Sequence, residues 1–375
     1  MTFIDFFSGI GGFRSGFEKA GMKCVGWCEF DKFAQKSYRA MYDTERLWFS
    51  DDVRKARGWE LPKADIWTFG FPCQDISVAG RQKGIKRGTR SGLFFEIMRL
   101  LDGCENSKPE WLVCENVKNL LSIDRGRGML TVLSEMDKRG YDAEWKVYNS
   151  KNYGVPQNRE RVYIAGRIRG GSAGELLPIP RENGATLSQI IGGSQGERVY
   201  DSNAISCTLS ANGGGQGAKT GLYSFIDFSN SKVKITDNAR HLLSRYTSGI
   251  TKHAAVNSGV SLKNGTKKGY IVAHHGDGVD LSYPKSETRK ARVQSKRSNT
   301  ITTQSNLGVN YSIRKLTPRE CWRLQGFTDE QFDKAQAVSS NSQLYKQAGN
   351  AVTVNVVYEI GKHIMGILGV EGENA

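Results

Sequence analysis

Three groups of side chains with catalytic chemistry follow short apolar segments of the sequence. Cys73 stands in GFPCQ directly after the predicted strand 66–69, Glu115 opens ENV at the end of another, and Arg159 and Arg161 belong to QNRERVY. A thiolate can attack carbon 6 of a pyrimidine ring. A carboxylic acid that hydrogen-bonds N3 stabilises the electrons that this addition places on the ring. Cys73 is therefore a candidate nucleophile, and the residue types are those that covalent addition to a pyrimidine ring requires.

The setting of Cys73 favours a nucleophile, although a lone cysteine is ordinarily a buried hydrophobic thiol. The ends of strands in α/β sheets are where ligands and catalytic groups gather. A free thiol titrates near about 8.5, and neighbouring positive charge favours its thiolate. The segment 81–90 contains five basic residues and no acidic one, so it could supply that charge. Arg159 and Arg161 alternate along a predicted strand and share one face, where they could hold a base edge or brace the catalytic loop.

A glycine-rich turn, DFFSGIGG at 5–12, follows the first predicted strand and precedes a helix. Glycines there let a ligand approach the backbone, and the helix N-terminus offers unpaired N–H groups. Arg14 stands where the pyrophosphate fingerprint needs glycine, which disfavours a dinucleotide. Glu29, just after the next strand, is placed to hold ribose hydroxyls. The pattern fits an adenosine ligand without phosphates, and a purely structural turn is the alternative.

Strand and helix signals alternate in the first part of the chain, which predicts a mostly parallel sheet covered on both faces. The predicted strands are 2–7, 23–28, 66–69, 111–114 and 162–165, and the predicted helices are 13–20 and 93–101. From about Arg169 to Asn310 small polar residues dominate, which predicts a second, irregular, β-rich domain entered through Pro178 and Pro180. Two stretches in it, 198–211 and 292–304, resemble each other. Helices at 318–324 and 352–368 follow, and the last should pack on the first domain.

Composition is that of a soluble globular protein with a polyanionic partner. The 375 residues suffice for two domains, 38% are hydrophobic and 24% charged, and the formal net charge is +15. The basic runs 81–90 and 285–297 are either phosphate contacts or solvated loops. No run is long and apolar enough for a membrane span, and the N-terminus lacks a basic leader. Seven scattered cysteines indicate a reducing cytoplasm, and Cys24 and Cys28 lack a second ligand pair for zinc.

Read together, the motifs resemble the DNA (cytosine-5) methyltransferase family. They are DFFSGIGG, GFPCQ, ENV, QNRERVY, RKLTPRECWRLQGF and QAGNAVTVNVV, in this order over residues 5–357. The resemblance implies an α/β fold: a Rossmann-like S-adenosylmethionine-dependent methyltransferase sheet with a second, smaller, irregular β-rich target-recognition domain. We expect residues 1–180 and 343–375 to form the catalytic domain and 181–342 the target-recognition domain.

The resemblance also implies roles for individual residues. Cys73 would attack carbon 6, Glu115 would contact N3 and the exocyclic amine, Arg161 would touch O2 of the cytosine, and Arg159 would support the Cys73 loop. Glu29 would bind the ribose of S-adenosylmethionine, Phe30 would pack on its adenine, and Asp52 would accept from the adenine amino group. The remaining cofactor positions are Phe7, Gly9, Ile10, Gly11, Gly12, Val53, Pro72, Leu93, Asn350 and Val352. No metal is implied.

The resemblance implies double-stranded DNA as the substrate, with the target cytosine flipped out of the stack. Parts of the variable segment resemble the recognition domain of a bacterial GCGC-methylating member, which suggests a GC-containing palindrome, although 224–307 departs from it as an insertion. The implied DNA-contacting residues are Ser77, Gln82, Arg90, Gln195, Arg198, Thr208, Leu209 and Lys219. We expect a cytoplasmic monomer in restriction-modification or phage DNA protection, with any cognate restriction endonuclease acting separately and no membrane contact.

Three other readings of the sequence compete with this one. An RNA cytosine-5 enzyme would share the fold, but the long glycine-rich variable domain favours reading of duplex DNA. A catalytically silent DNA-binding relative would have no need of Cys73, Glu115 and Arg161 together. A nicotinamide oxidoreductase is disfavoured by Arg14 in the glycine motif.

Overall fold

The computed structural model describes residues 1–72, 91–104, 107–170, 175–182, 313–367 and 369, together with short segments between 186 and 309. The chain divides into two compact units. The first consists of residues 1–184, 208–212 and 317–375, and the second of 185–207 and 213–316. No helix in the described ranges is long and apolar enough to cross a membrane.

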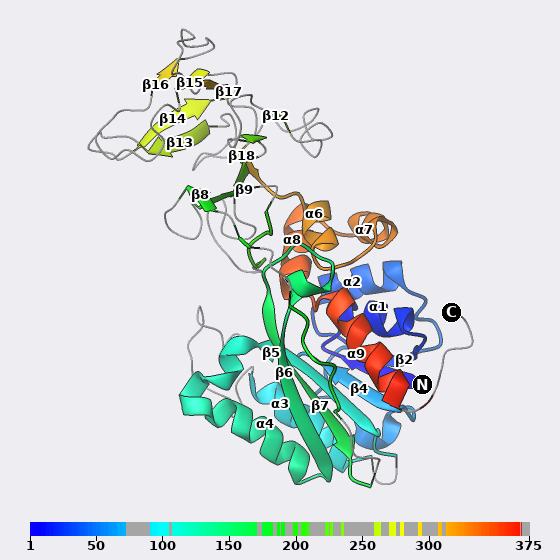
Figure 1. Cartoon of the computed structure of the whole chain (residues 1–375). Helices are drawn as coiled ribbons and strands as arrows, with labels where there is room; N and C mark the ends of the chain where they lie inside the picture. Colours follow the sequence, from blue (N-terminus) through cyan, green and yellow to red (C-terminus); the bar gives the residue numbers. More distant parts are fainter. Residues whose placement is uncertain are drawn as a thin grey trace. The chain divides into compact units, whose positions relative to one another are not determined.

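A seven-stranded sheet with the order β3-β2-β1-β4-β5-β7-β6 forms the centre of the first unit (Figure 1). Its strands are β1 (Thr2–Phe6), β2 (Lys23–Cys28), β3 (Trp48–Ser50), β4 (Ile66–Phe69), β5 (Trp111–Val117), β6 (Tyr141–Asn149) and β7 (Glu160–Ile168). Neighbours from β3 to β5 pair in parallel, whereas β7 runs antiparallel to both β5 and β6. The parallel strands therefore bring the residues that follow β1, β2, β3 and β4 to one edge.

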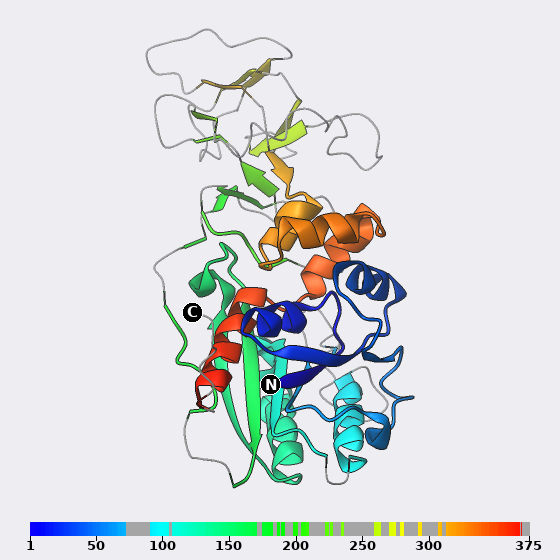
Figure 2. The ribbon, with the colours of Figure 1, turned by 90° about the vertical axis from the view of Figure 1, so that its right-hand side faces the viewer.

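Both faces of this sheet are buried, which explains why its inner strands are apolar at almost every position. Phe3 packs with the cluster of α1 (Gly12–Lys19) and α9 (Val354–Ile367), whereas its neighbour Ile4 packs with the cluster of α3 (Phe94–Asp102) and α4 (Arg127–Asp137). Figure 2 shows these helices on opposite sides of the sheet. The prediction of a sheet covered on both faces, with the last helix packed on it, is confirmed.

Helices α6 (Pro318–Arg323), α7 (Asp329–Gln336) and α8 (Asn341–Asn350) belong to the first unit. The first unit resumes at Thr317 rather than at the boundary after residue 342 expected from the sequence. Hydrogen bonds between distant segments hold these helices within the first unit. Trp322 donates its indole N–H to the carbonyl of Leu344 at 3.0 Å, and Gln331 Nε2 donates to Ser15 Oγ of α1 at 2.9 Å. The other elements of this unit are α2 (Lys32–Met41) and short 3₁₀ turns at Gly58–Glu60, Ser91–Leu93, Lys118–Leu121, Ile123–Gly126 and Ser150–Tyr153.

The second unit consists, in its described part, of short strands. A four-stranded sheet has the order β18-β10-β9-β8, and the remaining strands form pairs and a three-stranded sheet. The strands are β8 (Gln189–Ile191), β9 (Val199–Asp201), β10 (Leu222–Ser224), β11 (Ile226–Asp227), β12 (Lys234–Ile235), β13 (Gly259–Lys263), β14 (Tyr270–His274), β15 (Gly278–Asp280), β16 (Arg292–Gln294), β17 (Leu307–Val309) and β18 (Ile313–Lys315). The expectation of an irregular β-rich segment is confirmed. The two similar sequence stretches contribute β9 and β16, which lie in different sheets.

Candidate active site

Glu115 and Arg161 form an ion pair across the junction of β5 and β7. Arg161 Nε lies 3.1 Å from Glu115 Oε1, and the two side chains are only 16% and 12% exposed. Val117 pairs with Arg161 in the antiparallel register, which places Glu115 two residues away on the same face. Burial raises the pKa of Glu115, and the positive charges of Arg161 and Arg159 only partly offset this. The site therefore holds a carboxyl group that takes up a proton more readily than an exposed glutamate.

The segment that leads to Cys73 lies against this carboxyl group. A Cβ atom built on Gly70 would stand 3.4 Å from Glu115 Oε2, so glycine leaves the carboxylate room. The side-chain amide of Asn116 donates to the carbonyl of Phe71 at 3.1 Å, which ties the end of β4 to β5. Cys73 itself lies outside the described residues. Gly70 and Phe71 nevertheless bring the start of GFPCQ to Glu115, as the strand-end argument predicts.

Arg159 is 2% exposed and binds backbone carbonyls from distant parts of the chain. Its Nη2 donates to the carbonyls of Ala351 at 2.9 Å and Gly349 at 3.3 Å, and its Nη1 donates to that of Leu209 at 3.5 Å. The arginine therefore fixes the turn between α8 and α9, which carries Asn350 and Val352. The sequence predicts a brace for the Cys73 loop, and the structure shows this additional set of partners.

Glu29 connects the carboxyl ends of the parallel strands β1, β2 and β3 through hydrogen bonds. Its Oε2 accepts the N–H of Gly9 after β1, and its Oε1 accepts that of Asp31, both at 2.7 Å. Its own N–H donates to the carbonyl of Ser50 in β3 at 3.3 Å. Burial raises the pKa of Glu29 although these backbone donors oppose the shift. Each oxygen retains a lone pair for one further donor, such as a sugar hydroxyl.

The glycine turn has one open position and two packed ones. Phe7 and Gly9 both have positive φ, 53° and 56°, and a Cβ atom on Gly9 would meet nothing within 4 Å. A Cβ atom on Gly11 would lie 2.7 Å from the Tyr42 ring, and one on Gly12 would lie 2.4 Å from the carbonyl oxygen of Val352. Gly9 is therefore the glycine whose open side can admit a ligand. Packing and a φ of 80° account for Gly11, and packing accounts for Gly12.

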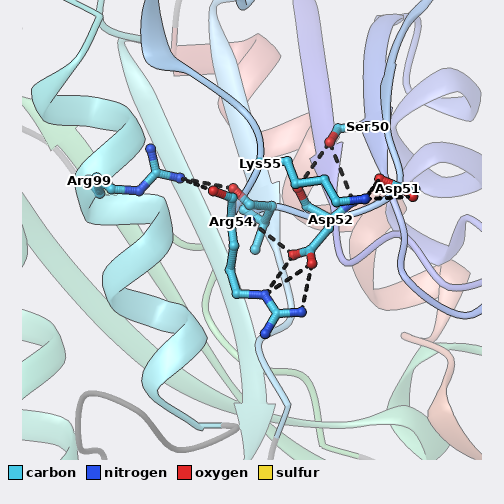
Figure 3. Close-up of polar contacts among 7 residues, drawn as sticks. Ser50, Asp51, Asp52, Arg54, Lys55 and Arg99 are labelled. Carbon is cyan, nitrogen blue, oxygen red and sulfur yellow. Dashed lines mark hydrogen bonds and ion pairs between the residues drawn. The ribbon is translucent and has the colours of Figure 1, made fainter.

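Asp52 lies beside Arg54 in the loop that follows β3 (Figure 3), and the Arg54 guanidinium also lies near the ring of Phe30. Arg54 Nε lies 2.9 Å and 3.0 Å from the two oxygens of Asp52, and its Nη2 lies 2.6 Å from Oδ2. Hydrogen bonding from Arg54 lowers the pKa of Asp52, so the carboxylate stays ionised as a hydrogen-bond acceptor. Phe30 is 69% exposed, with the Arg54 guanidinium 5.8 Å from its ring centre. A flat aromatic ligand could cover it.

The residues at this edge fit the adenosine part of S-adenosylmethionine. The Glu29 carboxylate suits ribose hydroxyls, the exposed ring of Phe30 suits a purine, and the anionic Asp52 suits an exocyclic amine. Ser8 Oγ is buried and has no hydrogen-bond partner among the described residues, which leaves a polar group for a ligand. Of the other predicted cofactor residues, Ile10 and Val53 are buried, Pro72, Leu93 and Val352 are half-buried, and Asn350 is exposed.

A pocket of about 450 Å³ opens next to the Glu115–Arg161 pair. It is lined by Val117, Lys118, Asn119, Asn158, Glu160, Arg161 and Thr208. Thr208 donates its hydroxyl to the carbonyl of Asn158, so Thr208 and Leu209, predicted to contact DNA, both lie beside the predicted catalytic arginines. Arg198 is exposed next to β9 in the second unit. Ser77, Gln82, Arg90, Gln195 and Lys219 lie outside the described residues.

The cysteines of the first unit that the structure describes are shielded from reaction. Cys24, Cys28, Cys104, Cys114 and Cys321 are buried as free thiols. Burial raises the pKa of Cys24 to about 12 and that of Cys104 to about 11. In the described part of the chain, no three histidine, cysteine, aspartate or glutamate side chains gather as metal ligands.

Sequence reasoning missed a buried polar network that supports the site. Thr353 Oγ1 donates to Gln325 Oε1 and lies within hydrogen-bonding distance of Ser150 Oγ, both at 2.9 Å, and Gln325 Nε2 donates to the carbonyl of Ala348 at 2.8 Å. The network holds α6, α8 and the turn before β7 together. A sequence signal existed, because Gln325 and Thr353 stand in two of the motifs, but their partners lie far away in the chain.

Comparison with known proteins identifies the family. The C-5 cytosine-specific DNA methylase family matches residues 1–366. The orphan methyltransferase M.Rho11sI of Bacillus phage rho11s is 30% identical, with 97% of this chain and 98% of that protein covered. The type II methyltransferase M.HhaI of Haemophilus parahaemolyticus is 29% identical, with 97% and 94% covered.

Solved structures show the same fold. The S. pombe Dnmt2 methyltransferase superposes with a TM-score of 0.59 at 15% identity, covering 98% of this chain and 99% of that one. A putative DNA modification methyltransferase from an E. coli prophage gives 0.53 at 18% identity, with 98% and 99% covered. The chain therefore belongs to the C-5 cytosine-specific DNA methylase family and is a DNA (cytosine-5) methyltransferase that uses S-adenosylmethionine.

Proposed function

We propose that Cys73 is the nucleophile of this methyltransferase and that Glu115, Arg161 and Arg159 assist it. The observation that carries the proposal is the buried Glu115–Arg161 pair, against which the start of GFPCQ lies at Gly70. Arg159 directly precedes β7 and Arg161 is its second residue, and the positive charges of both lower the pKa of the same carboxyl group. A cytosine bound here could form hydrogen bonds with the carboxyl group of Glu115 and with the adjacent guanidinium of Arg161.

The proposed reaction begins when the Cys73 thiolate forms a bond to carbon 6 of a flipped cytosine. Glu115 donates a hydrogen bond to N3, and Arg161 donates to O2, so the charge that develops on the ring is stabilised. S-adenosylmethionine supplies an electrophilic methyl group. Carbon 5 takes up this methyl group and then loses its proton to a base, and the thiolate of Cys73 departs as the ring regains its double bond. The products are 5-methylcytosine, S-adenosylhomocysteine and a proton.

We place the adenosine of the cofactor on Glu29, Phe30 and Asp52, with Gly9 as the open glycine beneath it. Phe7, Ile10, Gly11, Gly12, Val53, Pro72, Leu93, Asn350 and Val352 complete the proposed pocket, Gly11 and Gly12 through packing. This placement is supported by the common edge at which β1, β2 and β3 end. It is also supported by the two Glu29 oxygens, each of which accepts one backbone N–H and can accept one further hydroxyl.

The first unit is the proposed catalytic domain and the second the proposed target-recognition domain. Ser77, Gln82, Arg90, Gln195, Arg198, Thr208, Leu209 and Lys219 are proposed DNA contacts. The bacterial and phage relatives are named type II or orphan methyltransferases, which supports a role in restriction-modification or phage DNA protection. We further propose a cytoplasmic monomer that modifies a GC-containing palindrome, with any cognate endonuclease acting separately.

Covalent trapping tests the proposed nucleophile. A long duplex of mixed sequence, synthesised with 5-fluorocytosine, is incubated with the full chain and S-adenosylmethionine. Fluorine at carbon 5 cannot leave as a proton would, so the adduct with Cys73 should persist on a denaturing gel. Cys73→Ala should abolish it, and Cys207→Ala, which removes a half-exposed thiol, should leave it intact. An adduct that survives in Cys73→Ala would rule out Cys73, and an adduct only on a matched RNA would favour an RNA substrate.

A further inference from the structure

We infer that Arg99 is a positioning residue for cofactor binding, acting through the loop that carries Asp52 and Val53. This inference rests on the proposed adenosine site described above. Arg99 lies on α3 and binds the backbone of the loop 51–57, which carries Asp52. It is not one of the motif residues singled out from the sequence. Figure 3 shows its guanidinium directed at the backbone of this loop.

The guanidinium of Arg99 binds backbone carbonyls of this loop. Its Nη2 donates to the carbonyl of Val53 at 3.0 Å, and its Nη1 donates to that of Ala56 at 3.1 Å. Its Nε donates to Glu96 Oε2 at 2.7 Å, one turn earlier on α3. The planar fork of arginine suits two acceptors in fixed relative positions. Glu96 holds the fork in place, so the loop backbone is fixed against a helix.

The loop has no strand or helix of its own, so hydrogen bonds from side chains such as Arg99 and Ser50 help to fix its backbone. Residues 51–57 follow the three-residue strand β3 at the edge of the sheet. Val53 and Ala56 are buried, and a buried carbonyl that loses its donor is costly. Within the loop, Asp52 accepts the N–H of Arg54 at 3.0 Å. A shift of the Val53 carbonyl would therefore move the Asp52 carboxylate directly.

The same helix also carries the proposed contact of Leu93 at its beginning. Leu93 closes the 3₁₀ turn Ser91–Leu93, and α3 begins at the next residue. Two parts of the proposed pocket, Leu93 and the Asp52 loop, are thus attached to one rigid element. Arg99 attaches the Asp52 loop to this helix. Its removal should therefore weaken binding of the adenine and leave the arrangement around Glu115 unchanged.

Calorimetric titration of the full chain with S-adenosylhomocysteine, in the absence of DNA, tests this role. Arg99→Met keeps the length of the aliphatic stem and removes the donors. We expect its Kd to rise roughly tenfold, the scale of one lost hydrogen bond from a charged group. Arg99→Lys keeps a charged donor but lacks the planar fork, so it should recover only part of the affinity. The methyl-transfer rate at saturating cofactor should stay within about twofold of the wild type, because the reacting groups are not touched.

Arg139→Met is the matched control for a merely structural effect. Arg139 also binds α3, through the carbonyl of Met98 at 3.3 Å and the carboxylate of Asp102 at 2.9 Å and 2.7 Å, but it lies just after the end of α4. Both variants should lower the melting temperature. Only Arg99→Met should weaken S-adenosylhomocysteine binding. Equal Kd values for the two variants would overturn the inference.

A double-mutant cycle with Asp52→Asn tests the positioning role of Arg99 separately from the proposed adenosine site. If Arg99 acts through Asp52, Arg99→Met should weaken binding much less in the Asp52→Asn background than in the wild type. If Asp52→Asn weakens binding but the two effects multiply in full, the positioning role of Arg99 fails and the adenosine site stands. If Asp52→Asn binds as tightly as the wild type, the proposed adenosine site fails at Asp52.

Discussion

Arg159 Nη2 donates a 2.9 Å hydrogen bond to the carbonyl oxygen of Ala351, 192 residues later in the chain. The bond attaches the start of β7 to the turn that carries Asn350 and Val352. A second carbonyl, that of Gly349, shares the same Nη2 atom at 3.3 Å. The proposed catalytic and cofactor-binding residues are therefore held by one buried side chain.

Replacing Arg159 with methionine should destabilise the first unit. Three backbone carbonyls would lose a charged donor inside the protein, and we expect the free energy of unfolding to fall by about 2–4 kcal/mol. Urea unfolding measures this change. The control is Arg169→Met, at the other end of the same strand, where the arginine pairs with Asp137 and Asp142 at the surface. Similar effects of the two variants would contradict the role assigned to Arg159.

Two glycines of the first turn should respond differently to alanine. Gly12→Ala places a methyl group 2.4 Å from the Val352 carbonyl oxygen, and we expect a loss of about 3 kcal/mol of stability. Gly9→Ala meets nothing, and only its positive φ of 56° is strained, at a cost of about 1 kcal/mol. It should instead weaken binding of S-adenosylhomocysteine, which calorimetry would detect. Unchanged cofactor affinity in Gly9→Ala would argue against the open glycine as a ligand position.

Asp5 should make the stability of the fold depend on pH. Burial raises its folded-state pKa to about 7, although Thr68 Oγ1 donates to its Oδ1 at 3.0 Å. Between about pH 4 and 7 the folded state keeps a proton that the unfolded chain has released, so the free energy of unfolding falls as pH rises. Asp5→Asn removes this contribution. At pH 8 the free energy of unfolding of Asp5→Asn should exceed that of the wild type by about 1–3 kcal/mol, since each pKa unit is about 1.4 kcal/mol.

Urea unfolding at pH 5 and pH 8 compares the two proteins. The wild type should lose more stability than Asp5→Asn between these values. Parallel losses in both proteins would mean that Asp5 has no part in the pH dependence.

Glu115 should set the alkaline limit of methyl transfer. The protonated carboxyl group is the form that donates to N3, and burial raises its pKa, so activity should fall as pH rises through this raised pKa. Arg161→Gln removes the nearest cation, which raises the pKa of Glu115 further. In a profile of the single-turnover rate against pH, the fall on the alkaline side should then move to higher pH. The maximal rate should fall roughly 100-fold, because the contact of Arg161 with O2 of the cytosine is lost. Arg167→Gln, on the same strand but paired with Glu110, should leave the limb in place.

The sequence is a good guide to the inner strands and a poor guide to the sheet edge. β1, β2, β4 and β5 are buried on both faces, so apolar runs reveal them. β6 escapes prediction because it pairs only with β7 and because charged residues, Asp142, Glu144 and Lys146, interrupt its apolar pattern. Glu144 and Lys146 are half-buried and bind the backbone of Leu176 and Leu177, which the local sequence does not reveal. The direction of β7 also had no sequence signal, since antiparallel insertion depends on how the chain returns to the sheet.

The candidate site divides in the same way. Glu115 and Arg161 could be brought together from the sequence only through the family resemblance, because strand direction alone would place the start of a parallel strand at the opposite edge from Glu115. The contacts of Arg159 with Ala351, Gly12 with Val352 and Arg99 with Val53 could not, because each joins segments whose approach depends on the completed fold. Local patterns thus identify reactive groups, and the tertiary fold supplies the groups that hold them.

Bisulfite sequencing of plasmid DNA from cells that express the full chain tests the central claim most directly. The account predicts cytosines that resist conversion within one short recurring sequence, and complete conversion in cells that express Cys73→Ala at the same level. This pattern would establish the base, the position, the nucleophile and the target together. Complete conversion in both cultures, with soluble wild-type protein present, would contradict the claim that this chain methylates cytosine in DNA.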